Sequence, residues 1–127
     1  SYNLFEKLKL KNFSVMPGSE SKLLKGLELG CTGIITATCN VTAKIARRVY
    51  DDFNEGREQK YNKKLVDVRN AFEKYNLISA LHTFYSRDEK IYKNLLPPLR
   101  HLNKIDEQHL FEILDNLNFS FNSQKVA

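Results

Sequence analysis

The sequence has little of what marks unusual protein classes. It contains only 5 Gly and 3 Pro in 127 residues, which excludes collagen-like and low-complexity chains. Its longest apolar run, residues 34–37 with their neighbours, is far shorter than the roughly 18 residues of a membrane-spanning helix. It begins with neither a methionine nor a signal peptide, so we expect a chain that starts part-way through a longer protein.

Residues that ligate metals or form disulfides are also sparse. The two cysteines, Cys31 and Cys39, match neither zinc-site nor thioredoxin spacing. Each lies in an apolar stretch, which favours buried free thiols in a reducing compartment, the cytoplasm. The three histidines, His82, His101 and His109, lack the spacing of ligands. We therefore expect no metal site.

The charge balance is basic but mixed. Lysine and arginine number 20 against 15 acidic residues, a formal net charge of +5. The basic residues are interleaved with acids, as in residues 55–60, which favours an ordinary solvated surface over a nucleic-acid interface. Hydrophobic residues make up 42% of the chain, enough for a packed core.

Two segments are predicted to be buried strands. The first covers residues 13–16 and stops at Pro17. The second covers residues 33–38, is rich in β-branched side chains and lies between Gly30 and Asn40. Both are apolar on both faces, as parallel strands covered by helices are.

A helix is predicted after each strand. Residues 19–29 place three leucines on one face and stop at Gly30. The second helix runs from Asn40 as its N-cap to Gly56. Such alternation builds a parallel sheet, but two strands are too few for an independent one. With residues 1–12 interpreted as the end of a preceding helix, the segment is the tail of an α/β unit.

From Arg57 onward only helices are predicted. An apolar stripe defines the first of them: Tyr61, Leu65, Val68 and Phe72. Residues 77–85 are apolar enough for a second, buried helix. Pro97 and Pro98 prevent a helix at their position, and Asp106 is the predicted N-cap of the last one.

Two turns are candidate ligand sites, because ligands of parallel α/β folds bind outside the carboxyl ends of the strands. They are residues 17–20 and residues 37–40. Gly18 lets the backbone approach a ligand closely, and Glu20 could accept hydrogen bonds from substrate hydroxyls. The alternative is that the first turn is only a turn and that Ser19 and Glu20 only decorate the start of a helix.

The same residues resemble the pyruvate-dependent aldolase family, which includes dihydrodipicolinate synthase, N-acetylneuraminate lyase and 2-keto-3-deoxygluconate aldolase. The similarity rests on Phe-Ser-Val-Met-Pro-Gly-Ser-Glu at 13–20, Leu-Glu-Leu-Gly at 27–30 and Gly-Ile-Ile-Thr-Ala-Thr-Cys-Asn at 33–40. It continues through Phe-Asn-Glu-Gly at 53–56 to Leu-Pro-Pro-Leu at 96–99. It therefore covers nearly the whole chain in order.

The resemblance implies an α/β fold that is the C-terminal part of a (β/α)8 TIM barrel, followed by an all-helical extension. Residues 1–56 would supply the end of the sixth helix and the seventh and eighth strand–helix units. Residues 57–127 would form the C-terminal helical domain. Most of the barrel would then be missing, so the N-terminal barrel half is an expected partner, in a homo-oligomer that is a dimer or tetramer.

The resemblance also implies a carbon–carbon lyase that acts on a 2-keto acid and an aldehyde. In this family a lysine amine attacks the ketone of pyruvate, and the resulting iminium is the electron sink for cleavage or condensation. The lysine and a relay tyrosine would lie upstream of Ser1, so we expect no catalytic residue here and no activity of the chain alone. The Schiff base is covalent, so no cofactor is expected, nor a membrane or nucleic acid.

Four substrate-binding residues follow from the resemblance. Ile35 matches the eighth-strand position that lines the pyruvate site. Gly18 and Glu20 match the seventh-strand loop that contacts the variable end of the substrate, and Ser19 lies between them.

The identity of the substrate is less constrained. Ala37 stands where sialic acid lyases carry a substrate-binding serine, and residues 77–81 lack the Pro-x-Pro-x-Lys frequent in dihydrodipicolinate synthases. The Gly-Ser-Glu loop favours a 2-keto-3-deoxy sugar acid over a dihydrodipicolinate-type substrate. The alternative hypothesis belongs to another class of function. In it, the chain is a self-standing, basic helical module for binding or assembly, and nucleic acid is a candidate ligand of its basic surface. Salt-dependent retention on DNA or RNA would favour it.

Overall fold

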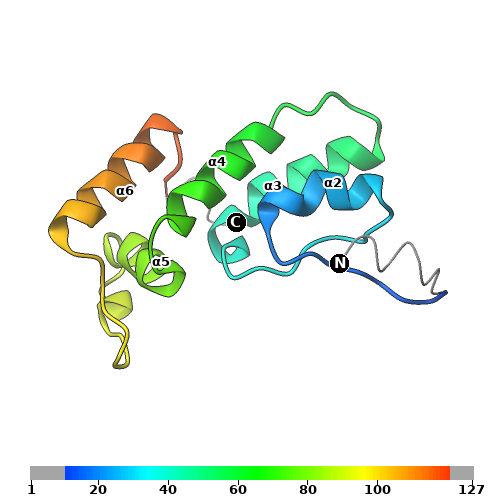
Figure 1. Cartoon of the computed structure of the whole chain (residues 1–127). Helices are drawn as coiled ribbons and strands as arrows, with labels where there is room; N and C mark the ends of the chain where they lie inside the picture. Colours follow the sequence, from blue (N-terminus) through cyan, green and yellow to red (C-terminus); the bar gives the residue numbers. More distant parts are fainter. Residues whose placement is uncertain (1–10, 121–127) are drawn as a thin grey trace.

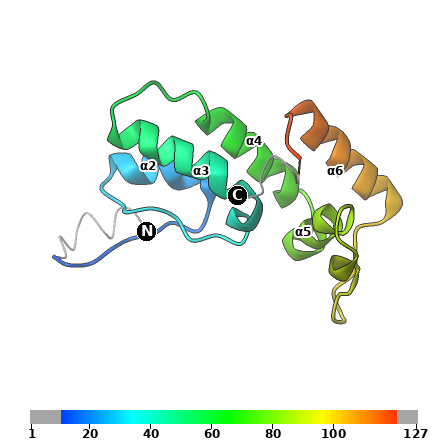
Figure 2. The same ribbon diagram turned by 180° about the vertical axis from the view of Figure 1, so that it is seen from behind.

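The computed structural model describes residues 11–120 (Figure 1). All regular elements of that part are helices: η1 (Glu20–Lys22), α2 (Leu23–Glu28), α3 (Cys39–Asn54), α4 (Asn62–Glu73), α5 (Leu77–Ser86), η2 (Lys90–Lys93) and α6 (Lys104–Asn116). In Figures 1 and 2, α2 and α3 lie at one end of the molecule, and α5 and α6 lie at the other. Helix α4 joins the two ends, since it contacts η1 and α3 as well as α5 and α6.

The prediction of strands over residues 13–16 and 33–38 is wrong. Both segments lie in the described part of the chain, and both are irregular there. The segments nevertheless lie side by side and run in the same direction. Two backbone hydrogen bonds join them: Thr32 N–H to Val15 C=O at 3.2 Å, and Ile35 N–H to Pro17 C=O at 3.1 Å. Proline has no N–H to donate in return, and two segments without neighbours do not sustain a sheet.

The helices predicted on either side of the second segment are confirmed. The predicted helix over residues 19–29 is η1 followed by α2, and the next one is α3. The N-cap of α3 is Thr38, not Asn40. Gly56 follows the helix end with a φ of 67°, a left-handed conformation that glycine adopts without a Cβ penalty. The helix proposed for residues 1–12 lies almost wholly outside the described residues.

The helices beyond Gly56 are confirmed as α4, α5 and α6, with one correction. The N-cap of α6 is Asn103, not Asp106. The Asn103 side-chain oxygen accepts a hydrogen bond from the Asp106 N–H at 2.8 Å, so Asp106 is the residue that is capped. Both residue types favour this position, and the helix begins at the earlier one. None of the helices within residues 11–120 is long and apolar enough to cross a membrane.

Three phenylalanines hold α4, α5 and the end of α6 together. Phe72 contacts Phe84 and Phe119 edge to face, with ring centroids 5.6 and 6.4 Å apart. Phe84 and Phe119 are 5.6 Å apart, and all three side chains are buried. The core continues between α2, α3 and α4 through apolar residues that are also buried: Leu23, Leu27, Val41, Ile45, Val49 and Leu65.

Truncation of this aromatic cluster should destabilise the chain strongly. Replacing Phe72 by Ala leaves a cavity among three helices and should lower the free energy of unfolding by about 3–5 kcal/mol. Phe13 is 59% exposed, so Phe13→Ala, the matched control, should stay within about 0.5 kcal/mol. Urea unfolding followed by circular dichroism measures both. Equal effects of the two substitutions would contradict this core.

Candidate functional site

A buried polar cluster lies where the two irregular segments end. It is built from Glu20 at the start of η1, Thr36 and Thr38 in the turn before α3, Thr42 on α3 and Arg69 on α4. Glu20, Thr38 and Thr42 are fully buried, and the Arg69 side chain is only 10% exposed. The cluster thus joins both predicted ligand turns to the first helix of the predicted C-terminal domain.

Both carboxylate oxygens of Glu20 are bound by the chain itself. Oε1 accepts a hydrogen bond from the Thr42 hydroxyl at 2.8 Å. Oε2 accepts hydrogen bonds from the Thr36 hydroxyl at 3.2 Å and from Arg69 Nη1 at 3.3 Å. A buried carboxylate needs such partners, because its transfer out of water is otherwise very unfavourable.

Arg69 holds the turn before α3 as well as Glu20. Its Nη1 donates to the Thr38 hydroxyl at 2.6 Å and to the Thr36 hydroxyl at 2.9 Å. Nη2 lies 3.6 Å from the carboxylate of Glu73, which is exposed. A single guanidinium on α4 therefore fixes the relative position of η1 and of the turn that leads into α3.

Sequence reasoning found Glu20 but missed Arg69. Arg69 stands four positions after Leu65 and three before Phe72, so it shares a helix face with the apolar stripe of α4. A charged residue on an apolar face indicates a buried partner, and this signal could have identified it. The threonines offered no comparable signal, because β-branched residues are equally typical of a strand.

Cys39 lies beside the cluster at the start of α3. Burial raises the pKa of its thiol above the ordinary value, and the negative charge of Glu20 raises this pKa further. Nucleophilic attack requires the thiolate, so the environment of Cys39 opposes nucleophilic chemistry at neutral pH. Among the described residues, no three side chains of His, Cys, Asp or Glu form a group that could hold a metal ion.

The four predicted substrate-binding residues do not all face the same way. Ile35 is 71% exposed. Gly18 lies next to it: a Cβ added to Gly18 would stand 3.8 Å from the Ile35 carbonyl oxygen. The Ser19 hydroxyl lies 2.9 Å from that of Ser21 at the surface. Glu20, in contrast, turns inward to Arg69. The structure thus brings Gly18 and Ile35 together, and a substrate-binding role of all four stays a prediction.

The Glu20–Arg69 pair should be a strong determinant of stability. Glu20→Leu leaves a buried guanidinium without its counter-charge, and Arg69→Met leaves a buried carboxylate without one. Each should lower the free energy of unfolding by about 3–5 kcal/mol. The double variant Glu20→Leu with Arg69→Met removes both charges, so it should be clearly more stable than either single variant.

A matched control is the pair of Lys25 and Glu28, which has a similar separation of 3.4 Å but is exposed. Lys25→Met should change stability by about 0–1 kcal/mol. Urea unfolding of all four variants measures these differences. Additive effects of the two single substitutions at Glu20 and Arg69 would contradict the pairing.

Known proteins resemble the chain along most of its length. The family model described as the dihydrodipicolinate synthetase family matches residues 2–117. No curated protein matches significantly. Similar solved structures include dihydrodipicolinate synthase DapA-2 from Bacillus anthracis, with 18% identity over 90% of this chain and 40% of that one, at a TM-score of 0.76.

Two other solved structures agree with this likeness. Dihydrodipicolinate synthase from Thermotoga maritima is 20% identical, with 88% of this chain and 39% of that one covered, at a TM-score of 0.75. YagE, a prophage protein of the dihydrodipicolinic acid synthase family from E. coli K12, was solved in complex with pyruvate. It is 18% identical, with 93% of this chain and 41% of that one covered, also at 0.75.

These similar structures show the fold of the chain. The chain spans about 40% of the length of each of the solved structures it matches. The family model shows which family this is, since it matches residues 2–117, well over half of the chain. The chain belongs to the dihydrodipicolinate synthetase family.

Proposed function

We propose that this chain is the C-terminal part of an aldolase-type carbon–carbon lyase that joins pyruvate to an aldehyde, or separates the two, through a Schiff base. The family match over residues 2–117 carries this proposal. The geometry supports it, because two parallel segments bring Gly18 and Ile35 together at their carboxyl ends, where parallel α/β folds bind ligands.

The proposed chemistry divides between this chain and the part upstream of it. A lysine upstream of Ser1 adds to the ketone of the 2-keto acid, and loss of water gives the iminium. Cleavage of the carbon–carbon bond then leaves its electron pair in an enamine and releases the aldehyde. In this chain, Ile35 would line the keto-acid side, while Gly18 and Ser19 would border the other end of the substrate. Glu20, held by Arg69, would fix the shape of that border.

The remainder of the barrel is the proposed partner of the two segments. Phe13, Met16 and Ile35 are 59%, 45% and 71% exposed, so both segments present large apolar side chains outward. Unpaired edges of extended chain also favour pairing with other chains. We propose that upstream strands cover this surface in the complete protein, which would be a dimer or tetramer.

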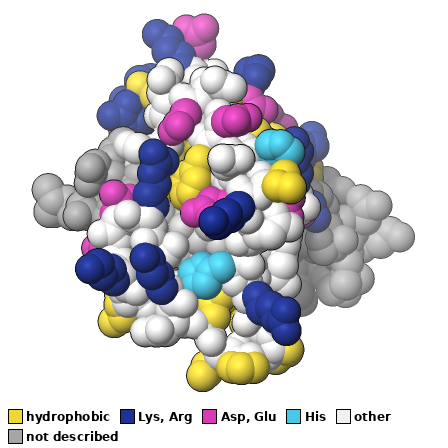
Figure 3. Space-filling model, turned by 90° about the vertical axis from the view of Figure 1, so that its left-hand side faces the viewer, with side chains coloured by type: hydrophobic (Ala, Val, Ile, Leu, Met, Phe, Trp, Pro, Cys, Tyr) yellow, Lys and Arg dark blue, Asp and Glu magenta, His cyan; other side chains and the backbone are white. Residues whose placement is uncertain are grey.

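The surface does not favour the nucleic-acid hypothesis. Figure 3 shows the face at the α5 and α6 end, where acidic side chains lie among the lysine and arginine side chains in the upper part and centre of the view. A nucleic-acid site needs a stripe or patch of one sign that follows the phosphates. No specific feature of this face indicates such a partner.

Trapping of the Schiff base tests the proposed function. Pyruvate and borohydride should leave the mass of the 127-residue chain unchanged, because its lysines lie outside the proposed reaction site. A chain extended upstream through the preceding barrel strands should gain one reduced pyruvate on a single lysine upstream of Ser1. Lactate, which has no ketone, is the control ligand. Mass spectrometry after proteolysis locates the adduct, and an adduct within residues 1–127, or none on the extended chain, would contradict the proposal.

A further inference from the structure

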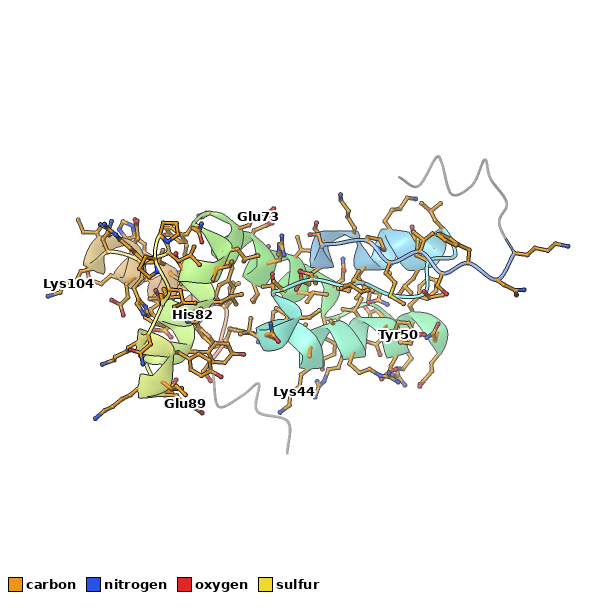
Figure 4. All side chains as sticks on the ribbon, turned by 90° about the horizontal axis from the view of Figure 1, so that it is seen from below. Lys44, Tyr50, Glu73, His82, Glu89 and Lys104 are labelled. Carbon is orange, nitrogen blue, oxygen red and sulfur yellow. The ribbon has the colours of Figure 1, made fainter. Side chains whose placement is uncertain are left out.

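A second feature, separate from the Glu20 cluster, is a half-open cavity between the turn before α3, helix α5 and η2. Its volume is about 370 Å³, within the range of small-molecule sites. Seven residues line it: Ala37, Asn40, Ile78, Leu81, His82, Tyr85 and Tyr92. Figure 4 labels His82 on α5. Two other labels mark the neighbouring elements: Lys44 on α3, and Glu89 just before η2.

The wall of the cavity contains no Lys, Arg, Asp or Glu and is mostly apolar or aromatic. The rings of Tyr85 and Tyr92 stack with centroids 4.8 Å apart. The ring of His82 meets Tyr92 edge to face at 5.9 Å. Ile78 and Leu81 supply aliphatic surface from the same helix. Flat rings pack well against such surfaces, in stacked or edge-on arrangements.

Most polar groups of the wall are engaged with one another. The Tyr85 hydroxyl donates to the Asn40 carbonyl at 2.8 Å, and the Asn40 side-chain amide donates to the Ala37 carbonyl at 2.9 Å. His82 is different. Its Nδ1 lies 3.4 Å from the Tyr92 carbonyl oxygen, which can only accept, so Nδ1 carries the proton. In the neutral ring, Nε2 is then an acceptor for a ligand's hydroxyl.

This wall discriminates between classes of ligand. A carboxylate or phosphate group would enter a site whose wall offers no positive charge, which is unfavourable. A chain of several hydroxyls would need more hydrogen-bond partners than these seven side chains offer. We propose that the cavity binds an uncharged aromatic ring that carries one hydroxyl, with the hydroxyl donating to His82 Nε2.

The cavity borders the end where substrate is expected, because Ala37 lies near the end of the second irregular segment. Binding of the ring does not rest on the proposed function, because all seven lining residues belong to this chain.

The test uses the 127-residue chain and the uncharged probe p-cresol. Methyl NMR signals of Ala37, Ile78 and Leu81 should shift in a saturable way as p-cresol is added. Toluene, which lacks the hydroxyl, should bind about three- to tenfold more weakly, as expected for the loss of one hydrogen bond. The anion 4-methylbenzoate should bind more weakly still.

Two variants and a control localise the effect. His82→Phe keeps a ring but removes the acceptor, so it should reduce p-cresol affinity to that of toluene and leave toluene binding unchanged. Ala37→Phe fills the cavity from an exposed position and should abolish binding of both. His109, which is exposed on α6 and outside the cavity, provides the control His109→Phe, which should change neither.

Three results would overturn the inference: no saturable shift with p-cresol, equal affinity for p-cresol and toluene, or tighter binding of 4-methylbenzoate. Each is independent of Schiff-base trapping in the extended chain. Failure of the cavity to bind the ring is therefore distinguishable from failure of the proposed function.

Discussion

The buried ion pair of Glu20 and Arg69 is the constraint on which the rest of this structure depends. A fully buried carboxylate can stay charged only if donors surround it, and Glu20 has donors from α3, from α4 and from the turn before α3. The same guanidinium binds Thr36 and Thr38. Helix α4 also packs on α5 and α6, so the pair sets where the C-terminal helices lie relative to the two irregular segments.

The two sides of the first turn, residues 17–20, therefore differ chemically. The inward side of the first turn is occupied by the Glu20 cluster, which uses charge to hold backbone in place. The outward side, with Gly18 beside Ile35, is open. The cavity at Ala37 is a third environment, aromatic and without Lys, Arg, Asp or Glu. We propose that recognition of a ligand depends on the open face and the cavity, while the buried charges maintain the geometry of the first turn and of the turn before α3.

The parts of the fold that depend on local spacing could be predicted from the sequence. Apolar side chains recur at helical spacing from Leu65 to Phe72, and α4 lies there. The strands could not be predicted from local spacing, because a strand is stable only when its backbone is hydrogen-bonded to neighbouring strands. Within the described residues, the two segments have only each other and Pro17 lacks a donor. The error at the start of α6 was also local, since Asn103 and Asp106 are both good N-caps.

The candidate site was predicted only in part, and for a physical reason. Its two turns were recognisable by their residue types and position. Its energetics depend on Arg69, which is 49 positions away from Glu20 in the sequence, and no local pattern pairs residues at that distance. Ile35 and Gly18 lie next to each other because parallel segments align their carboxyl ends, and their substrate-binding roles stay predictions.

Hydrogen exchange at the Arg69 guanidinium tests the central claim most directly. Nitrogen-15 NMR resolves side-chain N–H groups of an arginine when they are buried and hydrogen-bonded. If Arg69 is buried and paired with Glu20, its Nη1 protons should exchange slowly, whereas those of Arg100, which is exposed, should exchange fast. In the Glu20→Gln variant, exchange at Arg69 should accelerate because the charge-assisted bond is lost. Exchange at Arg69 as fast as at Arg100 in the unmodified chain would contradict the account.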